Sequence, residues 1–267
     1  MKSRRSHPTA RQYAESLASA GRYSFSSSEA ETALGVSTNA AVLALNRLAK
    51  QGLLASPARS IYVIIPPEYR SLGCLPPEQF IPDLMKRLKL PYYVSLLSAA
   101  EYHGAAHQRP QALQVFLEAK RRPIVCGRAR VVFMVRKRLR AVPVQTLNTP
   151  RGELLISTPE STALDLVGYE QRAGGLNLVA TVLSELAEKI DPAKLVAAAH
   201  AAPIVWAQRL GYLLEHVDAA AKAAPLQRYV RARAEKATPL APARALKQGP
   251  RDPTWKVYVN AEVETDV

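Results

Sequence analysis

The stretch SSSEAETALGVSTN, from Ser26 to Asn39, decides the fold of the first part of the chain. Serine hydroxyls followed by Glu29 favour the start of a helix, and Leu34-Gly35 is typical of a helix end. Ser37 then offers a second N-cap, and apolar residues continue near helical spacing up to Gly52. The stretch therefore predicts a short helix, a tight turn and a longer helix, which is the order of a helix-turn-helix.

The flanking sequence predicts one helix before this pair and a hairpin after it. Residues 9–20 carry Tyr13, Leu17 and Ala20 at helical spacing, and Gly21 follows as a C-cap. Residues 53–55 and 61–65 form two short apolar runs, separated by Ser56-Pro-Ala-Arg-Ser60. We therefore expect a winged helix-turn-helix over residues 1–70, although the wing has no glycine in its turn.

The longer helix is expected to read the major groove of DNA. Asn39, Asn46 and Arg47 have the chemistry to reach base edges, whereas hydroxyl and basic side chains suit phosphates. The candidate DNA-binding residues are Ser37, Thr38, Asn39, Asn46, Arg47, Lys50, Arg59 and Ser60. The residues expected in the core are Leu34, Val36, Val42, Leu45 and Leu48. A helical bundle without a nucleic-acid role is the alternative, and the basic residues Lys2, Arg4, Arg5 and Arg11 argue against it.

Composition points to a globular, cytoplasmic protein with a polyanionic partner. Of the 267 residues 48% are hydrophobic, which is enough for a real core, and the sequence contains no apolar run that would span a membrane or form a signal peptide. The two cysteines form no paired motif, so two free, buried thiols are expected. A net charge of +14 attracts polyanions at long range, and nucleic acid is the first partner to consider.

Part of this charge is concentrated in the stretch 120–140. The expected second basic surface consists of Arg121, Arg122, Arg136, Lys137, Arg138 and Arg140. A second basic run lies at 222–236. Either stretch could instead be a solvated face that keeps the protein soluble.

The rest of the chain predicts a connector and a larger α+β domain. Prolines at 66, 67, 76, 77 and 82 are expected to break any regular element, so residues 71–88 are assigned to a proline-rich connector. Within the C-terminal domain, 89–267, strands are expected at 113–117, 130–135 and 154–157, and a last strand at 255–260 closes the small sheet. Thr158-Pro159-Glu160 starts a series of helices.

Four segments, taken in order, resemble the AbiEi family of antitoxins. They are YYVSLLSAAEYHG from Tyr92, STPESTALDL from Ser157, RLGYLL from Arg209 and WKVYVN from Trp255. The resemblance implies a type IV toxin-antitoxin (abortive infection) antitoxin that represses its own operon at inverted repeats, bound by two copies of the chain. It also implies a nucleotidyltransferase toxin, which the C-terminal domain counters either with or without stable contact.

Other function classes find less support in the sequence. Phosphate-loop, dinucleotide and serine-nucleophile motifs are missing, so no enzyme and no cofactor are expected. His103 and His107 stand four apart but lack the zinc-protease glutamate, and helix capping explains Glu160 without an acid–base partnership with Asp165. No metal site is therefore expected. The alternative left open is a sequence-specific regulator whose C-terminal domain binds another protein or RNA, without antitoxin activity.

Overall fold

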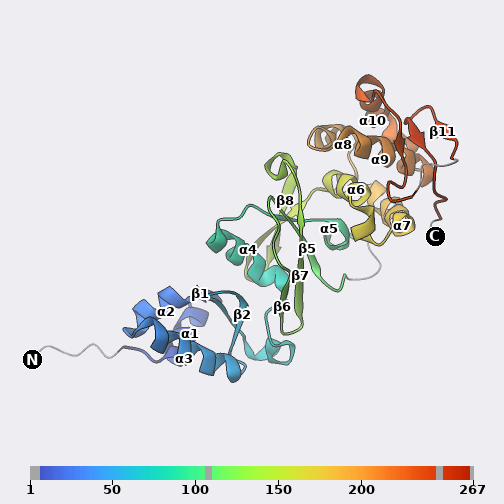
Figure 1. Cartoon of the computed structure of the whole chain (residues 1–267). Helices are drawn as coiled ribbons and strands as arrows, with labels where there is room; N and C mark the ends of the chain where they lie inside the picture. The colour runs from blue at the N-terminus through green and yellow to red at the C-terminus, as the bar shows by residue number, and fades with distance from the viewer. Residues whose placement is uncertain (1–6, 106–109, 245–248, 265–267) are drawn as a thin grey trace, which may run out of the picture. The chain divides into compact units, whose positions relative to one another are not determined.

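A computed structural model describes residues 7–105, 110–244 and 249–264 (Figure 1). About 49% of the described residues are helical and 19% lie in strands, which confirms the predicted α+β class. The chain divides into two compact units, and each takes segments from several parts of the sequence. The first unit comprises Met1–Tyr92, Gln111–Met134 and Thr146–Leu154, and the second Tyr93–Pro110, Val135–Gln145 and Leu155–Val267. The domain boundaries expected after residues 70 and 88 remain predictions.

Of the three N-terminal helices, the second and third begin at the predicted serine caps, and the first begins after Thr9, which was not predicted as a cap. They are α1 (Ala10–Ser19), α2 (Ser27–Leu34) and α3 (Thr38–Lys50). The hydroxyls of Thr9 and Ser26 accept backbone N–H groups in capping boxes, and Ser37 caps α3. Gly35 ends α2 with a φ of 60°, a left-handed conformation that glycine adopts without steric cost. Local capping chemistry therefore sets the boundaries of this part of the fold.

A small antiparallel sheet follows the helices. Its strands are β1 (Ser24–Ser26), β2 (Leu54–Ala58) and β3 (Ile61–Ile64), in the order β1-β3-β2. The strand β1 was not predicted. Ala58 pairs with Ile61, so β2 runs further than expected and the hairpin tip is Arg59-Ser60. Ser60 takes the positive φ, 61°, that a glycine often supplies at such a turn. The hairpin forms without glycine.

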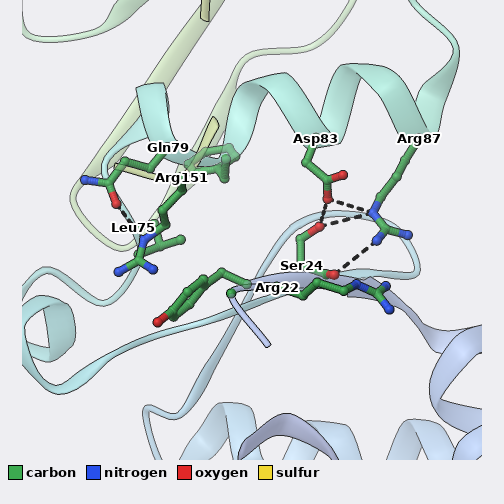
Figure 2. A pocket seen from close by; sticks show the side chains of 10 residues that line it. Arg22, Ser24, Leu75, Gln79, Asp83, Arg87 and Arg151 are labelled. Carbon is green, nitrogen blue, oxygen red and sulfur yellow. Dashed lines mark hydrogen bonds and ion pairs between the residues drawn. The ribbon is translucent and has the colours of Figure 1, made fainter. Parts of the chain in front are cut away.

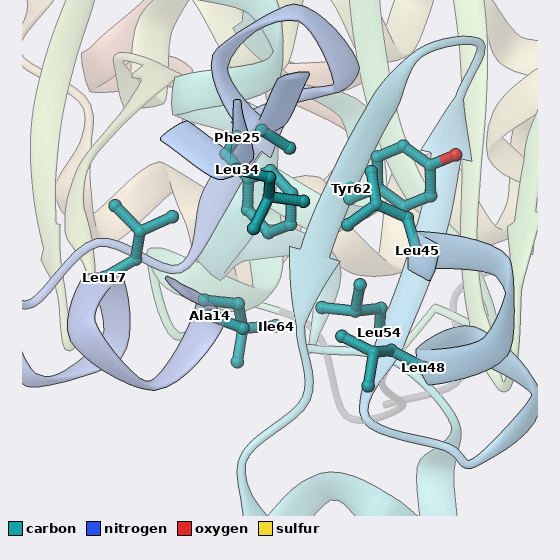
Figure 3. Packing of buried hydrophobic residues seen from close by; sticks show 10 residues of the cluster. Ala14, Leu17, Phe25, Leu34, Leu45, Leu48, Leu54, Tyr62 and Ile64 are labelled. Atoms are coloured by element: carbon teal, nitrogen blue, oxygen red, sulfur yellow. The ribbon is translucent and has the colours of Figure 1, made fainter. Parts of the chain in front are cut away.

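The helices and this sheet share one hydrophobic core (Figure 3). Phe25 lies at its centre, edge-on to the Tyr13 ring at 5.4 Å and stacked on Tyr62 at 5.8 Å. Leu34, Leu45 and Leu48 are buried there, as predicted. The expectation that Val36 belongs to the core was wrong, because its side chain is 40% exposed in the turn between α2 and α3.

The expected break at the prolines of residues 71–88 was wrong. The segment contains α4 (Pro77–Leu88), preceded by the 3₁₀ turn η1 (Pro67–Leu72). Pro77 occupies the first helical position, where its missing N–H is not needed, and Pro82 lies inside the helix. Burial of Phe80, Ile81, Leu84 and Met85 along one face offsets the cost of the internal proline.

The first unit also contains strands from later in the chain. They are β5 (Leu113–Leu117), β6 (Ile124–Cys126) and β7 (Ala129–Val135), side by side in the order β6-β7-β5, and parts of β8 (Val144–Thr149) and β9 (Gly152–Ser157). Three of these strands were predicted from their apolar runs. Cys74 and Cys126 are free and buried, as expected.

The second unit is mostly helical. Its elements are β4 (Tyr93–Val94), α5 (Leu96–Tyr102), α6 (Pro159–Gly168), α7 (Leu176–Leu186), α8 (Pro192–Ala199), α9 (Ile204–His216) and α10 (Ala220–Arg233). Val94 of β4 pairs in parallel with Ile156. Thr158 caps α6 ahead of Pro159, as the sequence predicts. No helix in the described residues is both long and apolar enough to cross a membrane.

The predicted last strand does not close the larger sheet. Only Val257–Tyr258 form β12, which lies in a separate sheet with β10 (Thr238–Pro239) and β11 (Arg251–Asp252). Trp255, just before it, is fully buried against Gly211 of α9, where an added Cβ would lie 1.9 Å from the indole. The indole therefore anchors the C-terminal segment to a helix.

Candidate nucleic-acid interface

One face of α3 presents polar and basic side chains to solvent. Asn39, Asn46, Arg47 and Lys50 are all exposed, and their spacing of three, four and seven residues keeps them on one side of the helix. The opposite side buries Ala41, Leu45 and Leu48, and the two leucines belong to the core shown in Figure 3. The core therefore orients α3 and leaves this face available to a partner.

The hydroxyls at the start of α3 already have roles within the protein. Ser37 accepts the N–H of Ala40 at 3.4 Å, and the Thr38 hydroxyl donates to the Glu31 carboxylate at 2.9 Å. Both residues are exposed, so they remain accessible, but Thr38 must give up its bond to Glu31 to donate to a phosphate. The start of α3 is thus anchored to α2.

The hairpin tip exposes Arg59 and Ser60. Ser56 stabilises this tip because its hydroxyl lies 3.1 Å from the Ala58 carbonyl and 3.0 Å from that of Ile61. The backbone carbonyl of Ser60 accepts the Ser27 N–H at 2.9 Å, which ties the tip to the start of α2. Arg59 is therefore presented on a fixed turn.

A network around Arg87 fastens α4 to β1 and α2, and Figure 2 shows its contacts with Asp83 and Ser24. Its guanidinium donates to Asp83 at 2.8 Å, to Glu29 at 2.6 Å and to the Ser24 carbonyl at 3.0 Å. Burial opposes ionisation of Glu29, but the Ser26 N–H and the guanidinium groups of Arg22 and Arg87 outweigh it. Together they lower the pKa of Glu29 to about 2.

Arg151 lies against the same region, beside a cavity of about 160 Å³ (Figure 2). Its guanidinium lies 3.5 Å from the centre of the Tyr23 ring and donates to Gln79 at 2.8 Å and to Glu68 at 3.4 Å. The contacts of Arg87 with Glu29 and of Arg151 with Gln79 left no sequence signal, because they join residues 58 and 72 positions apart. The arginines that line the cavity therefore already have hydrogen-bond acceptors within the protein.

Arg136 was wrongly assigned to a second basic surface, because its side chain is only 4% exposed. It pairs with Asp165 at 3.0 Å, lies over the Trp206 ring at 4.4 Å and donates to the Ala201 carbonyl at 3.2 Å. An arginine that far from solvent does not contact a nucleic acid. Charge counting along the sequence cannot separate such a residue from its exposed neighbours.

Asp165 is the centre of this buried polar cluster. One carboxylate oxygen accepts the Tyr93 hydroxyl at 2.8 Å and the Ser95 hydroxyl at 3.0 Å, while the other faces Arg136. Complete burial raises the pKa of Asp165, and the guanidinium and the two hydroxyls oppose that rise. The cluster joins β4, the residue that follows β7 and α6, so its geometry indicates a structural centre of the second unit.

The other residues of the predicted basic surface fall into both units. Lys137, Arg138 and Arg140 are exposed in the second unit. In the first unit Arg122 is exposed, whereas Arg121 is half-buried with its guanidinium 5.6 Å from the centre of the Phe133 ring. A common surface for all of them therefore stays a prediction.

The residues weighed as metal ligands or an acid–base pair have other partners. His103 donates to the Ser157 carbonyl at 2.9 Å, and burial lowers the pKa of its imidazole. Glu160 accepts the Asp191 N–H at 3.0 Å. The described residues contain no group of three or more side chains suited to a metal ion. His107 and the basic residues Lys2, Arg4 and Arg5 lie outside the described residues.

Comparisons with known proteins place this geometry in context. Residues 93–216 match the model of the AbiEi antitoxin C-terminal domain, which confirms the resemblance found in the sequence and supports an antitoxin role. The fold is similar to the crystal structure of the RV2827C protein from Mycobacterium tuberculosis, with a TM-score of 0.68 and 18% identity, covering 94% of this chain and 91% of that one. The comparison with curated proteins finds no match.

Proposed function

We propose that this chain, whose residues 93–216 match the AbiEi antitoxin C-terminal domain, is a non-enzymatic DNA-binding autorepressor and type IV antitoxin. In this proposal the N-terminal helices and hairpin form a winged helix-turn-helix that binds the promoter of the chain's own operon. The C-terminal domain counters a nucleotidyltransferase toxin in the cytoplasm.

The exposed face of α3 is the observation that carries the DNA-binding part. It combines two amides that suit adenine with a guanidinium that suits guanine, on a helix whose other side is held in the core. Arg59 at the hairpin tip and Lys50 at the end of α3 can neutralise phosphates. A net charge of +14 adds long-range attraction to DNA.

The antitoxin part is supported by the family match, which covers helices α5, α6, α7, α8 and α9. If the operator is an inverted repeat, two copies of the chain bind, one to each half-site. The alternative is a regulator of the same DNA-binding type whose C-terminal domain binds another protein or RNA. The exposed basic residues Lys137, Arg138 and Arg140 are what favour this alternative.

A salt-titrated gel shift on the DNA upstream of the gene, against a scrambled duplex of equal length, tests the DNA-binding part. We expect selective binding that Arg47→Ala weakens by about 1–3 kcal/mol, because the guanidinium that binds a base edge is removed. Lys50→Ala should weaken binding to both duplexes and reduce the salt slope by about one unit. If the unchanged protein bound both duplexes equally and with strong salt sensitivity, its basic charge would attract DNA without sequence selection.

A growth-rescue assay with the cognate toxin tests the antitoxin part. Arg47→Ala should lose repression of a promoter fusion and keep rescue, because the two activities reside in different parts of the chain. Loss of rescue in Arg47→Ala at normal protein abundance would mean that antitoxicity requires DNA binding. Failure of the unchanged protein to rescue growth would favour the alternative regulator.

A further inference from the structure

Leu43 is a large hydrophobic side chain in the middle of the exposed face of α3, where it is 59% exposed. Asn39 precedes it by four residues, and Asn46 and Arg47 follow at three and four, so all of them share one stripe of the helix. In the sequence Leu43 belongs to an apolar run with Val42 and Leu45, and nothing there gives it a separate role.

Packing does not account for this position. The core is filled from the other side of α3 by Ala41, Leu45 and Leu48, all at most 7% exposed. Leu43 is absent from the described core cluster and from its partly buried rim. A polar residue at this position would be compatible with the helix and would leave the exposed face fully hydrophilic.

The major groove offers an apolar group that such a side chain can contact. Each A·T pair exposes the thymine C5-methyl beside the N6 and N7 atoms of adenine, which an asparagine amide can bind. Asn39 and Asn46 flank Leu43 on the stripe, so an amide and an apolar tip can reach the same pair or neighbouring pairs. Packing does not explain why Leu43 is exposed. If the partner is an A·T step, however, the exposed side chain can contact the thymine methyl group.

We infer that Leu43 reads thymine through contact with its C5-methyl group and makes the bound site depend on an A·T pair at that position. This inference rests on the proposed DNA-binding function and extends it to a component of the sequence preference. It names one residue and one chemical group, and the two can be removed independently.

The test replaces thymine by uracil throughout the upstream duplex, which removes the methyl groups and keeps base pairing. For the unchanged protein we expect about a fourfold weaker affinity for each methyl group removed from the interface, since burial of one such group is worth about 0.8 kcal/mol. Leu43→Ala should bind the thymine duplex more weakly and show little difference between the two duplexes. Leu43→Met should retain part of the preference for thymine.

Arg47→Ala is the matched control, because it should weaken both duplexes and keep the thymine-to-uracil ratio of the unchanged protein. An equal ratio in the unchanged protein and Leu43→Ala would overturn the inference while leaving DNA binding intact. If the two ratios were equal and Leu43→Ala also sedimented differently from the unchanged protein, Leu43 would be assigned to a contact between protein chains instead. Absence of selective binding by the unchanged protein would overturn the proposed DNA-binding function itself.

Discussion

Gly35 controls the turn between α2 and α3 through its backbone conformation. A Cβ at this position would lie 2.5 Å from the His7 ring, but His7 is exposed and its ring can rotate away. The φ of 60° remains, and it costs about 1 kcal/mol or more for alanine and less for asparagine. Gly35→Ala should therefore lower the free energy of unfolding more than Gly35→Asn does.

Urea denaturation followed by circular dichroism measures both variants. Gly52→Ala is the control, because Gly52 has a similar φ of 71° with no neighbouring atom within 4 Å of the added Cβ. Equal losses at Gly35 and Gly52 would show that the backbone conformation dominates. A much larger loss at Gly35, relieved by His7→Ala, would show instead that the ring contact is rigid.

Asp165 is expected to be among the most sensitive positions of the second unit. Asp165→Asn leaves the Arg136 guanidinium buried without its counter-charge, and breaking such a pair costs about 3–5 kcal/mol. The double variant Asp165→Leu with Arg136→Met removes both charges and should recover a large part of that loss. Thermal unfolding measures the three proteins, and a single variant as stable as the unchanged protein would show that the pair contributes little.

Between elements, the ion-pair network on β1, α2 and α4 makes stability depend on pH. The folded pKa of Glu29 is about 2, below the unfolded value of about 4.3, so its contribution is present above about pH 4.3. That contribution is lost as the pH falls from about 4.3 towards 2. Glu29→Gln should therefore lose less stability than the unchanged protein across this interval.

Urea unfolding at pH 6, 4 and 3 follows this difference. Arg87→Gln removes one of the two guanidinium partners and should give an intermediate dependence, because Arg22 still lies 2.5 Å from the carboxylate. Parallel curves for the unchanged protein and Glu29→Gln would mean that solvent screens the network. Because Glu29 is partly exposed, we expect the effect to be modest.

Helix boundaries could be read from the sequence, since caps such as Ser26, Ser37 and Thr158 act on N–H groups within a few residues. Val42 was expected in the core, but it is only half-buried and lies outside the described core cluster, while its neighbour Leu43 is exposed. Contacts between Arg87 and Glu29, or Arg136 and Asp165, join residues 58 and 29 positions apart and leave no local signal. The candidate base-contacting face was predictable, whereas its apolar member and the buried centre were not.

The whole chain does not divide cleanly at any one peptide bond. The core of α1, α2, α3 and their sheet lies within residues 10–64, but α4 belongs to a unit completed by 111–134 and 146–154. A fragment ending at residue 92 should therefore expose the apolar face of α4 and bind a hydrophobic dye such as ANS, while a fragment ending at residue 66 should not.

Circular dichroism and dye fluorescence distinguish these fragments, with the full chain as the reference. Equal, low dye binding by both fragments would mean that α4 finds sufficient cover without the later strands. The expected result also bears on antitoxin assays, in which deletions after residue 92 disturb the first unit as well as the second. Point variants therefore separate the two activities better than truncations do.

The interleaving of the two units also has a consequence for synthesis on the ribosome. The helices proposed to read DNA can bury their core once residue 64 has emerged, whereas the rest of the first unit waits for residue 154. Typical elongation rates are about 5–20 residues per second. For several seconds the nascent chain therefore has a folded N-terminal core, while the rest of the first unit is still incomplete. Under the proposed function, the chain therefore becomes competent to bind a promoter before it becomes competent to counter a toxin.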